Sequence, residues 1–266
     1  MSPLLRRLFV LLLPLAAAAA TTPAPATAAV SVRVLCYNIH HGEGLDGRLD
    51  LERIAALIKA QEADLVALQE VERGTQRTQR RDLPAELAQL TGLTVRFARN
   101  IPYQGGEYGT AVLSRFPIRR VAHTPLKVIG QGEQRGVQQV WVDVHGTEIL
   151  FLNTHLDHRR DPAERERSVE EIRALVAAAG PVPVIVAGDF NATPDSPAIA
   201  TMRGFLRDAW TAVGQGPGHT IPVRQPNRRI DYIWGSSHFV PTRMEVLASE
   251  ASDHLPISAL LMLSRP

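Results

Sequence analysis

Four short polar clusters follow apolar, strand-like runs at widely separated points of the chain. They are Asn38, Glu70, the pair Asp189 and Asn191, and the pair Asp253 and His254. Carboxylates and amides that strands bring together, with a histidine among them, can hold a hard divalent cation and a water molecule against a phosphate. These residues therefore predict a site for phosphoester chemistry.

The cluster around Asp189 carries the most detailed signal. The apolar run from Val184 to Ala187 is followed by Gly188, which permits a close approach of backbone segments. In an extended chain Asp189 and Asn191 project from the same face. A carboxylate there can orient or deprotonate water while the amide holds it or the phosphate. The alternative is an Asx turn that leads into residues 192–194.

Histidines supply the second part of the candidate site. Asp231 is placed to orient His254, as carboxylates do in acid/base pairs. His155 and His158 follow another strand-like run, and a structural role for either ring is the alternative. Their spacing is compatible with zinc, but no cysteine motif or HExxH helix accompanies it. We therefore do not expect a zinc site.

The elements that must position these residues are short and mixed. Strands are expected at 31–37, 64–69, 109–114, 138–144, 147–154, 182–188, 229–234, 244–248 and 258–263, and helices at 51–61, 83–90 and 162–179. Asp50 and Gly92 are expected to cap the first two helices, and His145-Gly146 is typical of a hairpin turn. Hairpins mixed with helices predict an α+β fold of two packed sheets with helices outside. Residues 213–226 read as a surface loop that can equally lie beside the site.

The first 29 residues have the pattern of a secretory signal peptide. Arg6 and Arg7 precede an apolar run and a small-residue stretch that ends at Ala29. We therefore expect export to a periplasm or the medium, one domain over residues 30–266, and no stable membrane span. Without Arg6 and Arg7 the basic and acidic residues balance, so net charge makes no case for nucleic acid. Cys36, the single cysteine, excludes an internal disulfide and reads as a core residue.

Taken together, these segments resemble the endonuclease/exonuclease/phosphatase superfamily of DNase I-like phosphoesterases. The motifs occur in family order from about residue 32 to 263: YNIH (37–40), LQEV (68–71), YGTAVLSR (108–115), NTHLDH (153–158), GDFN (188–191), RIDYIW (229–234) and SDHLP (252–256). The resemblance implies a four-layer α/β/β/α sandwich with a metal cleft at one end of its two sheets.

By motif, the resemblance also implies roles for individual residues. Glu70 would be the main ligand of Mg²⁺, or of Mn²⁺ as an alternative, with Asn38 beside it and Asp253 supporting His254 or a second metal. The implied catalytic residues are His155, Asp189, Asn191, Asp231 and His254. Motifs leave open whether Asp189 or His254 is the base. Thr110 stands where relatives often have asparagine, so we do not count it as catalytic, and Tyr108 and Arg115 are either cleft or packing residues.

The resemblance predicts an exported, Mg²⁺-dependent phosphodiesterase, which we expect to be a monomer. Nucleic acid is the favoured substrate, and a phospholipid or small phosphoester is the alternative. Arginines form two clusters, Arg77, Arg80 and Arg81, then Arg159, Arg160, Arg165 and Arg167. The second is interspersed with acidic residues, as on a solvated helix face. Aromatic residues make up only 5% of the chain, and no exposed aromatic hairpin for lipid is evident.

Overall fold

The computed structural model describes residues 30–264, so the predicted signal peptide lies outside the described residues. Two six-stranded mixed sheets form the body of the molecule, with strand orders β11-β12-β1-β2-β4-β3 and β5-β6-β7-β8-β10-β9. The only parallel pairs between their neighbouring strands are β1 with β2 and β7 with β8. Within the same residues, no helix is long and apolar enough to cross a membrane.

The first sheet comprises β1 (Val30–Asn38), β2 (Leu65–Arg73), β3 (Thr94–Tyr103), β4 (Gly106–Ser114), β11 (Phe239–Val246) and β12 (Ile257–Leu263). Its helical segments are η1 (His40–Gly42), α1 (Leu51–Ala60) and α2 (Leu83–Thr91). The second sheet comprises β5 (Ile118–Pro125), β6 (Gly136–Val144), β7 (Thr147–His155), β8 (Val184–Asp189), β9 (Arg207–Asp208) and β10 (Asp231–Gly235). The remaining helices are α3 (Ala163–Ala178), α4 (Pro197–Arg203) and α5 (Ala209–Val213).

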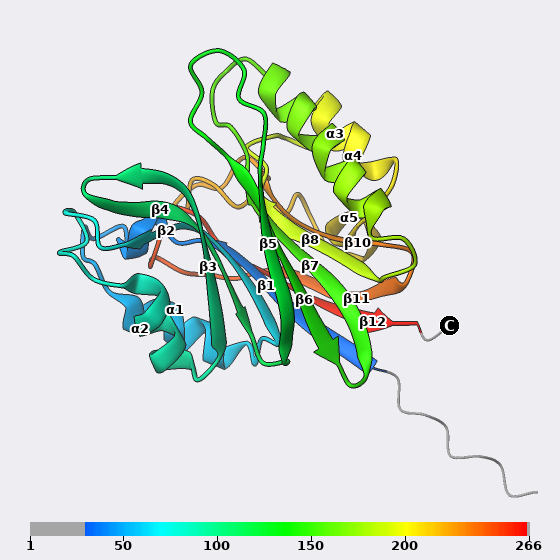
Figure 1. Ribbon diagram of the computed structural model, residues 1–266, viewed down its shortest axis with the longest axis horizontal. Coiled ribbons are helices and arrows are strands. Elements are labelled where there is room, and N and C mark those ends of the chain that lie inside the picture. Colours follow the sequence, from blue (N-terminus) through cyan, green and yellow to red (C-terminus); the bar gives the residue numbers. More distant parts are fainter. Residues whose placement is uncertain (1–29, 265–266) are drawn as a thin grey trace, which may run out of the picture.

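Three apolar clusters join four layers. One lies between the sheets, a second joins the first sheet to α1 and α2, and a third joins the second sheet to α3 and α4. Figure 1 shows these two helix pairs on opposite sides of the paired sheets. The predicted α+β fold with a four-layer α/β/β/α arrangement is therefore confirmed, while the predicted limits of its domain stay a prediction.

The strands explain how polar residues reach one place. Along a strand alternate side chains point to the same face. Val34 and Cys36 of β1, and Ile185 and Ala187 of β8, lie in the cluster between the sheets. The next residues in those rows are Asn38 and Asp189. The space between the sheets therefore changes from apolar to polar at one end, where β1, β7 and β8 end.

A pair of buried amides marks this change. The side chain of Gln69 on β2 donates to Oδ1 of Asn153 on β7 at 2.8 Å. Asn153 in turn donates to the backbone oxygens of Leu68 and Ala111 in the first sheet at 3.0 and 2.9 Å. Because every one of these groups finds a partner, the polar layer can be buried without an unpaired amide.

Local signals for the predicted elements are mostly confirmed. Asp50 accepts a hydrogen bond from the backbone N–H of Arg53 at the start of α1, and Gly92 ends α2 in the left-handed region at φ 73°. His145 and Gly146, both at positive φ, form the turn between β6 and β7. The strands β3 and β5 were not predicted. They are edge strands whose exposed, arginine-containing sequences lack a clear apolar pattern.

A substitution at Gly188 tests the close approach of β7 and β8 beneath the polar end. A Cβ atom there would lie 2.2 Å from the backbone oxygen of Thr154, which cannot move without separating the two strands. Gly188→Ala should lower the free energy of unfolding by about 1 to 3 kcal/mol in chemical denaturation. Gly204→Ala is the control, since a Cβ there meets only Thr201 O at 3.1 Å. Equal losses in the two variants would contradict this account of Gly188.

Candidate active site

Asp189 is the centre of the polar end. It is the last residue of β8, and its side chain is buried. Its backbone oxygen accepts from the N–H of Leu156, and its Oδ1 accepts from the N–H of Asn191 at 2.9 Å. Asn191 adopts φ 47°, which asparagine tolerates better than most residues, and donates its amide to Leu156 O at 3.1 Å. The carboxylate is thus held in one orientation, with Oδ2 toward the cleft residues.

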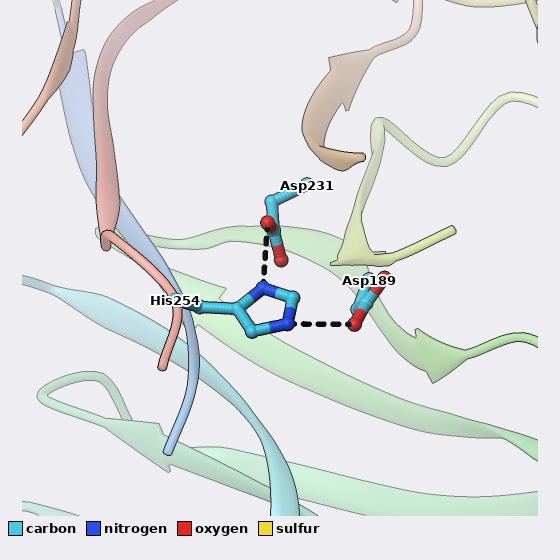
Figure 2. Close-up of side chains that lie close together, drawn as sticks. All are labelled: Asp189, Asp231 and His254. Atoms are coloured by element: carbon cyan, nitrogen blue, oxygen red, sulfur yellow. Dashed lines mark hydrogen bonds and ion pairs between the residues drawn. The ribbon is translucent and has the colours of Figure 1, made fainter. Parts of the chain in front are cut away.

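His254 lies between two carboxylates, as Figure 2 shows. Its Nδ1 donates to Oδ2 of Asp231 at 3.0 Å, and its Nε2 lies 3.7 Å from Oδ2 of Asp189. Asp231 Oδ2 also accepts from the hydroxyl of Thr220 at 2.5 Å. The loop that carries Thr220 is the segment for which the sequence left two placements open, and it lies beside the site.

His155 reaches Asp189 from the opposite strand of the parallel pair. It ends β7, is buried, and its Nε2 is 3.6 Å from Oδ2 of Asp189. Its Nδ1 accepts from Nη1 of Arg135 at 3.0 Å. Two imidazoles therefore face one carboxylate oxygen through Nε2. Behind each ring, Nδ1 contacts an acidic residue, Asp231, in the case of His254 and a basic residue, Arg135, in the case of His155.

Asn38 joins Glu70 to Asp189. Its Nδ2 donates to Oε1 of Glu70 at 3.0 Å and to Oδ2 of Asp189 at 3.1 Å, while its Oδ1 accepts from the N–H of His40. The structure thus brings Asn38, Glu70, His155, Asp189, Asn191, Asp231 and His254 together.

Glu70 reaches this site because β2 is irregular. Val66 and Leu68 face the helices, so strict alternation would send Glu70 the same way. The pairing of β2 with β4 shifts between Leu68 and Val71, and Glu70 itself adopts φ 56°. Such bulges redirect side chains, and strained backbone of this kind clusters at functional sites.

The other named residues lie at various distances from the centre. Asp253 accepts from the hydroxyl of Ser252 at 3.3 Å and is not among the residues that line the pocket. Tyr108 lines the pocket, whereas Thr110 is buried and donates to Gln138. Arg115 pairs with Asp64, next to the start of β2 and so at the other end of the sheets.

The pocket itself has a volume of about 240 Å³. Its lining includes Glu133 and Arg135, which sequence reasoning missed. They stand in the polar stretch before β6, where a solvated loop is the ordinary reading and no spacing distinguishes them. Thr220 was missed for the same reason, since it lies in a Gly/Pro-rich loop.

The burial of these charges shifts their pKa values in different directions. Burial, and then the negative charge of Asp231, raises the pKa of Asp189 above its usual range. Burial by itself lowers the pKa of His254, but the charges of Asp231 and Asp189 outweigh it and raise that pKa to about 10. Burial and the charge of Arg135 lower the pKa of His155 well below its usual range. The site therefore favours one charged and one neutral imidazole.

The donor set fits a hard divalent cation. Glu70 and Asp189 direct carboxylate oxygens at the same amide N–H₂ group of Asn38, so two anions already share one positively polarised partner. Glu70 supplies a carboxylate oxygen and Asn38 a side-chain amide oxygen, and oxygen ligands of this type suit Mg²⁺. Ligand atoms of Asp189, Asp231 and His254 also lie within 4.8 Å of one another, but a charged His254 ring has no free lone pair for a metal ion, so the cation is better held by Glu70 and Asn38.

Comparisons with known proteins agree with one another. Residues 35–254 match the model of the endonuclease/exonuclease/phosphatase family. The uncharacterized protein YbhP of Escherichia coli strain K12 is 30% identical over 253 residues, which cover 88% of this chain and 97% of that protein.

Solved structures share the fold. An endonuclease/exonuclease/phosphatase from Beutenbergia cavernae is 27% identical, with a TM-score of 0.75 over 88% of this chain and 72% of its own. A mannosyl-6-phosphatase from Bacteroides thetaiotaomicron is 19% identical, with a TM-score of 0.75 over 87% of this chain and 100% of its own. The DNase I-like arrangement predicted from the motifs is thus the arrangement found.

The contact between His254 and Asp231 predicts a pH dependence of stability. A folded pKa of about 10 lies above the ordinary value of 6.5, so the stabilisation is fully present below pH 6.5 and is lost as the pH rises through 10. Between these two pH values, one such group lowers the free energy of unfolding by up to about 1.4 kcal/mol for each pH unit. In Asp231→Asn this decrease with pH should be smaller, because the contact that raises the pKa is lost.

Denaturant unfolding at several pH values measures this slope, and NMR titration of the His254 ring measures its pKa. Asp143→Asn is the control, because Asp143 pairs with Arg119 on the surface of β6. A His254 pKa that Asp231→Asn leaves unchanged would show that the raised value has another cause.

Proposed function

The chain belongs to the endonuclease/exonuclease/phosphatase family and is a phosphoester hydrolase, and from that premise we propose metal-dependent attack of water on a small phosphorylated substrate. One observation carries this proposal: two imidazoles converge on Asp189 in a pocket that Glu70 also lines. This set combines a proton acceptor, two hydrogen-bond donors and oxygen ligands for a cation, which are the groups that phosphoryl transfer to water requires.

Asp189 is the base in this proposal. Nδ1 of His254 donates to Asp231, and the charges of Asp231 and Asp189 raise the pKa of the ring to about 10, so near neutral pH both ring nitrogens carry hydrogen. A ring in that state donates to a phosphoryl oxygen and cannot take a proton from water. Asp189 then receives the proton of the attacking water, while its Oδ1 is held by the backbone N–H of Asn191. The side chain of Asn191 lines the same pocket, where its amide would hold the water or the phosphate.

Glu70 and Asn38 hold the cation in this proposal, with Mg²⁺ expected and Mn²⁺ as the alternative. When bound, a divalent cation polarises the phosphoryl group and offsets the charge that develops on its oxygens. Asp253, next in sequence to His254, keeps a supporting role. His155 supplies a second hydrogen-bond donor to the phosphoryl oxygens.

The surroundings of the pocket favour a small substrate over the nucleic acid expected from the motifs. A volume of about 240 Å³ is below the roughly 300 to 1,000 Å³ of typical ligand pockets, which favours a small group in the pocket itself. Five arginines of the two sequence clusters form ion pairs: Arg77 with Glu72, Arg81 with Glu86, Arg159 and Arg165 with Asp157, and Arg167 with Glu171. Their charge is therefore partly neutralised for a polyanion.

A nucleic-acid strand is the second candidate because of aromatic side chains beside the pocket. The rings of Tyr103 and Tyr108 lie 6.1 Å apart, and the guanidinium of Arg77 lies over Tyr103 at 4.9 Å. Aromatic side chains near a phosphate site can stack with a base.

Export through the signal peptide of residues 1–29, to a periplasm or the medium, completes the proposal, together with a monomeric state. Blotting of cell fractions and sizing by light scattering test these two points. Protein that is retained in the cytoplasm at its full length would remove the export step.

Substitution of Glu70 tests the metal dependence. Glu70→Gln removes a charge from the proposed ligand set, so the Mg²⁺ concentration for half-maximal hydrolysis of bis-p-nitrophenyl phosphate should rise at least about tenfold. EDTA should abolish the wild-type rate, and Mn²⁺ should restore it. Glu62→Gln is the matched control, because Glu62 is an exposed partner of Arg33. Hydrolysis that persists in EDTA would refute the metal dependence.

A substrate panel with Mg²⁺ tests the substrate class. Mannose 6-phosphate and small phosphodiesters should be hydrolysed faster than plasmid DNA, RNA or sphingomyelin vesicles, and changes in salt should affect the rate little. Faster cleavage of DNA or RNA, with a steep loss of rate as salt rises, would establish the second candidate instead.

A further inference from the structure

Arg135 is a buried cation of the pocket, although it stands in a polar stretch of sequence. Its side chain is only 3% exposed. Its backbone oxygen accepts from the N–H of Leu126 at 2.9 Å and from the side chain of Gln134 at 2.7 Å. These bonds fix the backbone of Arg135. Burial of its guanidinium is costly unless partners surround that group, so the contacts of the side chain indicate its role.

The guanidinium divides its donors between two histidines. Nη1 donates to Nδ1 of His155 at 3.0 Å, and Nη2 donates to Nδ1 of His158 at 3.3 Å. Glu133 balances the charge, with its Oε1 3.0 Å from Nη1 of Arg135. All of these residues line the same pocket.

The direction of these hydrogen bonds fixes the state of the rings. Arginine has only donors, so Nδ1 of each histidine must be the acceptor and carries no hydrogen. The single hydrogen of each neutral ring is then on Nε2. For His155, that nitrogen is the one that lies 3.6 Å from Oδ2 of Asp189.

We propose that Arg135 is a positioning residue that fixes His155 as the Nε2–H tautomer, so that this ring always presents a hydrogen to the phosphoryl group beside Asp189. The catalytic consequence depends on the proposed function, but the tautomer does not. In the other tautomer, the lone pair of Nε2 would face the carboxylate and the phosphoryl oxygen, and both contacts would be repulsive.

The same pocket contains the opposite arrangement. Asp231 accepts from Nδ1 of His254, so a hydrogen remains on that nitrogen and the ring is stabilised as a cation. Arg135 and Asp231 thus give two histidines different states from equivalent positions behind their rings. If Arg135 only stabilised the fold, its donors would not need to contact Nδ1 of both histidines.

¹⁵N NMR of histidine-labelled wild-type protein tests the tautomer without a variant. His155 should show a pyridine-type signal for Nδ1 and a pyrrole-type signal for Nε2. In Arg135→Met the two tautomers should both be populated, while Arg135→Lys, which keeps a donor, should retain the wild-type signals. A pyrrole-type Nδ1 in the wild-type protein would overturn the proposal.

A double-mutant cycle tests the catalytic consequence. Arg135→Met should lower kcat in proportion to the population of the Nε2–H tautomer that remains, by about twofold to tenfold where both tautomers are populated. In a His155→Ala background no ring remains for Arg135 to orient. In that background Arg135→Met should therefore leave kcat unchanged, within about 1.5-fold.

Equal losses in both backgrounds would show a general structural role for Arg135 and overturn the proposal. Arg135→Lys should recover much of the rate in the wild-type background, which guards against a variant that simply folds poorly. A wild-type protein inactive on every phosphoester would refute the proposed function instead, and the NMR signals would still decide the tautomer.

Discussion

The buried carboxylate of Asp189 is the group on which the rest of the site depends. A charge removed from water is tolerated only with partners, and those partners come from four separate places: Asn38 on β1, His155 on β7, the N–H of Asn191, and His254. Each of them is in turn held by a further group, so one buried charge organises residues from both sheets. Burial and the negative charge of Asp231 nevertheless raise the pKa of Asp189, which suits a group that must take up a proton.

Much of the fold follows from local patterns that the sequence displays. The cap at Asp50, the left-handed Gly92 and the hairpin turn at His145-Gly146 each depend on a few adjacent residues, and each was predictable. The edge strands β3 and β5 were not, because an exposed strand needs no apolar alternation.

The site divides in the same way. Asn38 and Asp189 continue strand rows that face the space between the sheets, so their convergence follows from alternation once the fold is assumed. Glu70 does not, because its direction depends on a bulge that alternation alone would never predict. Arg135 could not be predicted for another reason. Its burial results from contacts with residues about twenty positions later, and no pattern in residues 130–136 indicates those contacts.

The amide pair of Gln69 and Asn153 has a mechanical consequence. Since Asn153 belongs to β7 but donates to backbone oxygens of both β2 and β4, the second sheet is fastened to the first directly below the pocket. The sheets cannot slide past each other without breaking several buried hydrogen bonds at once. The floor of the pocket is therefore rigid, and the residues above it keep a fixed base from both sheets.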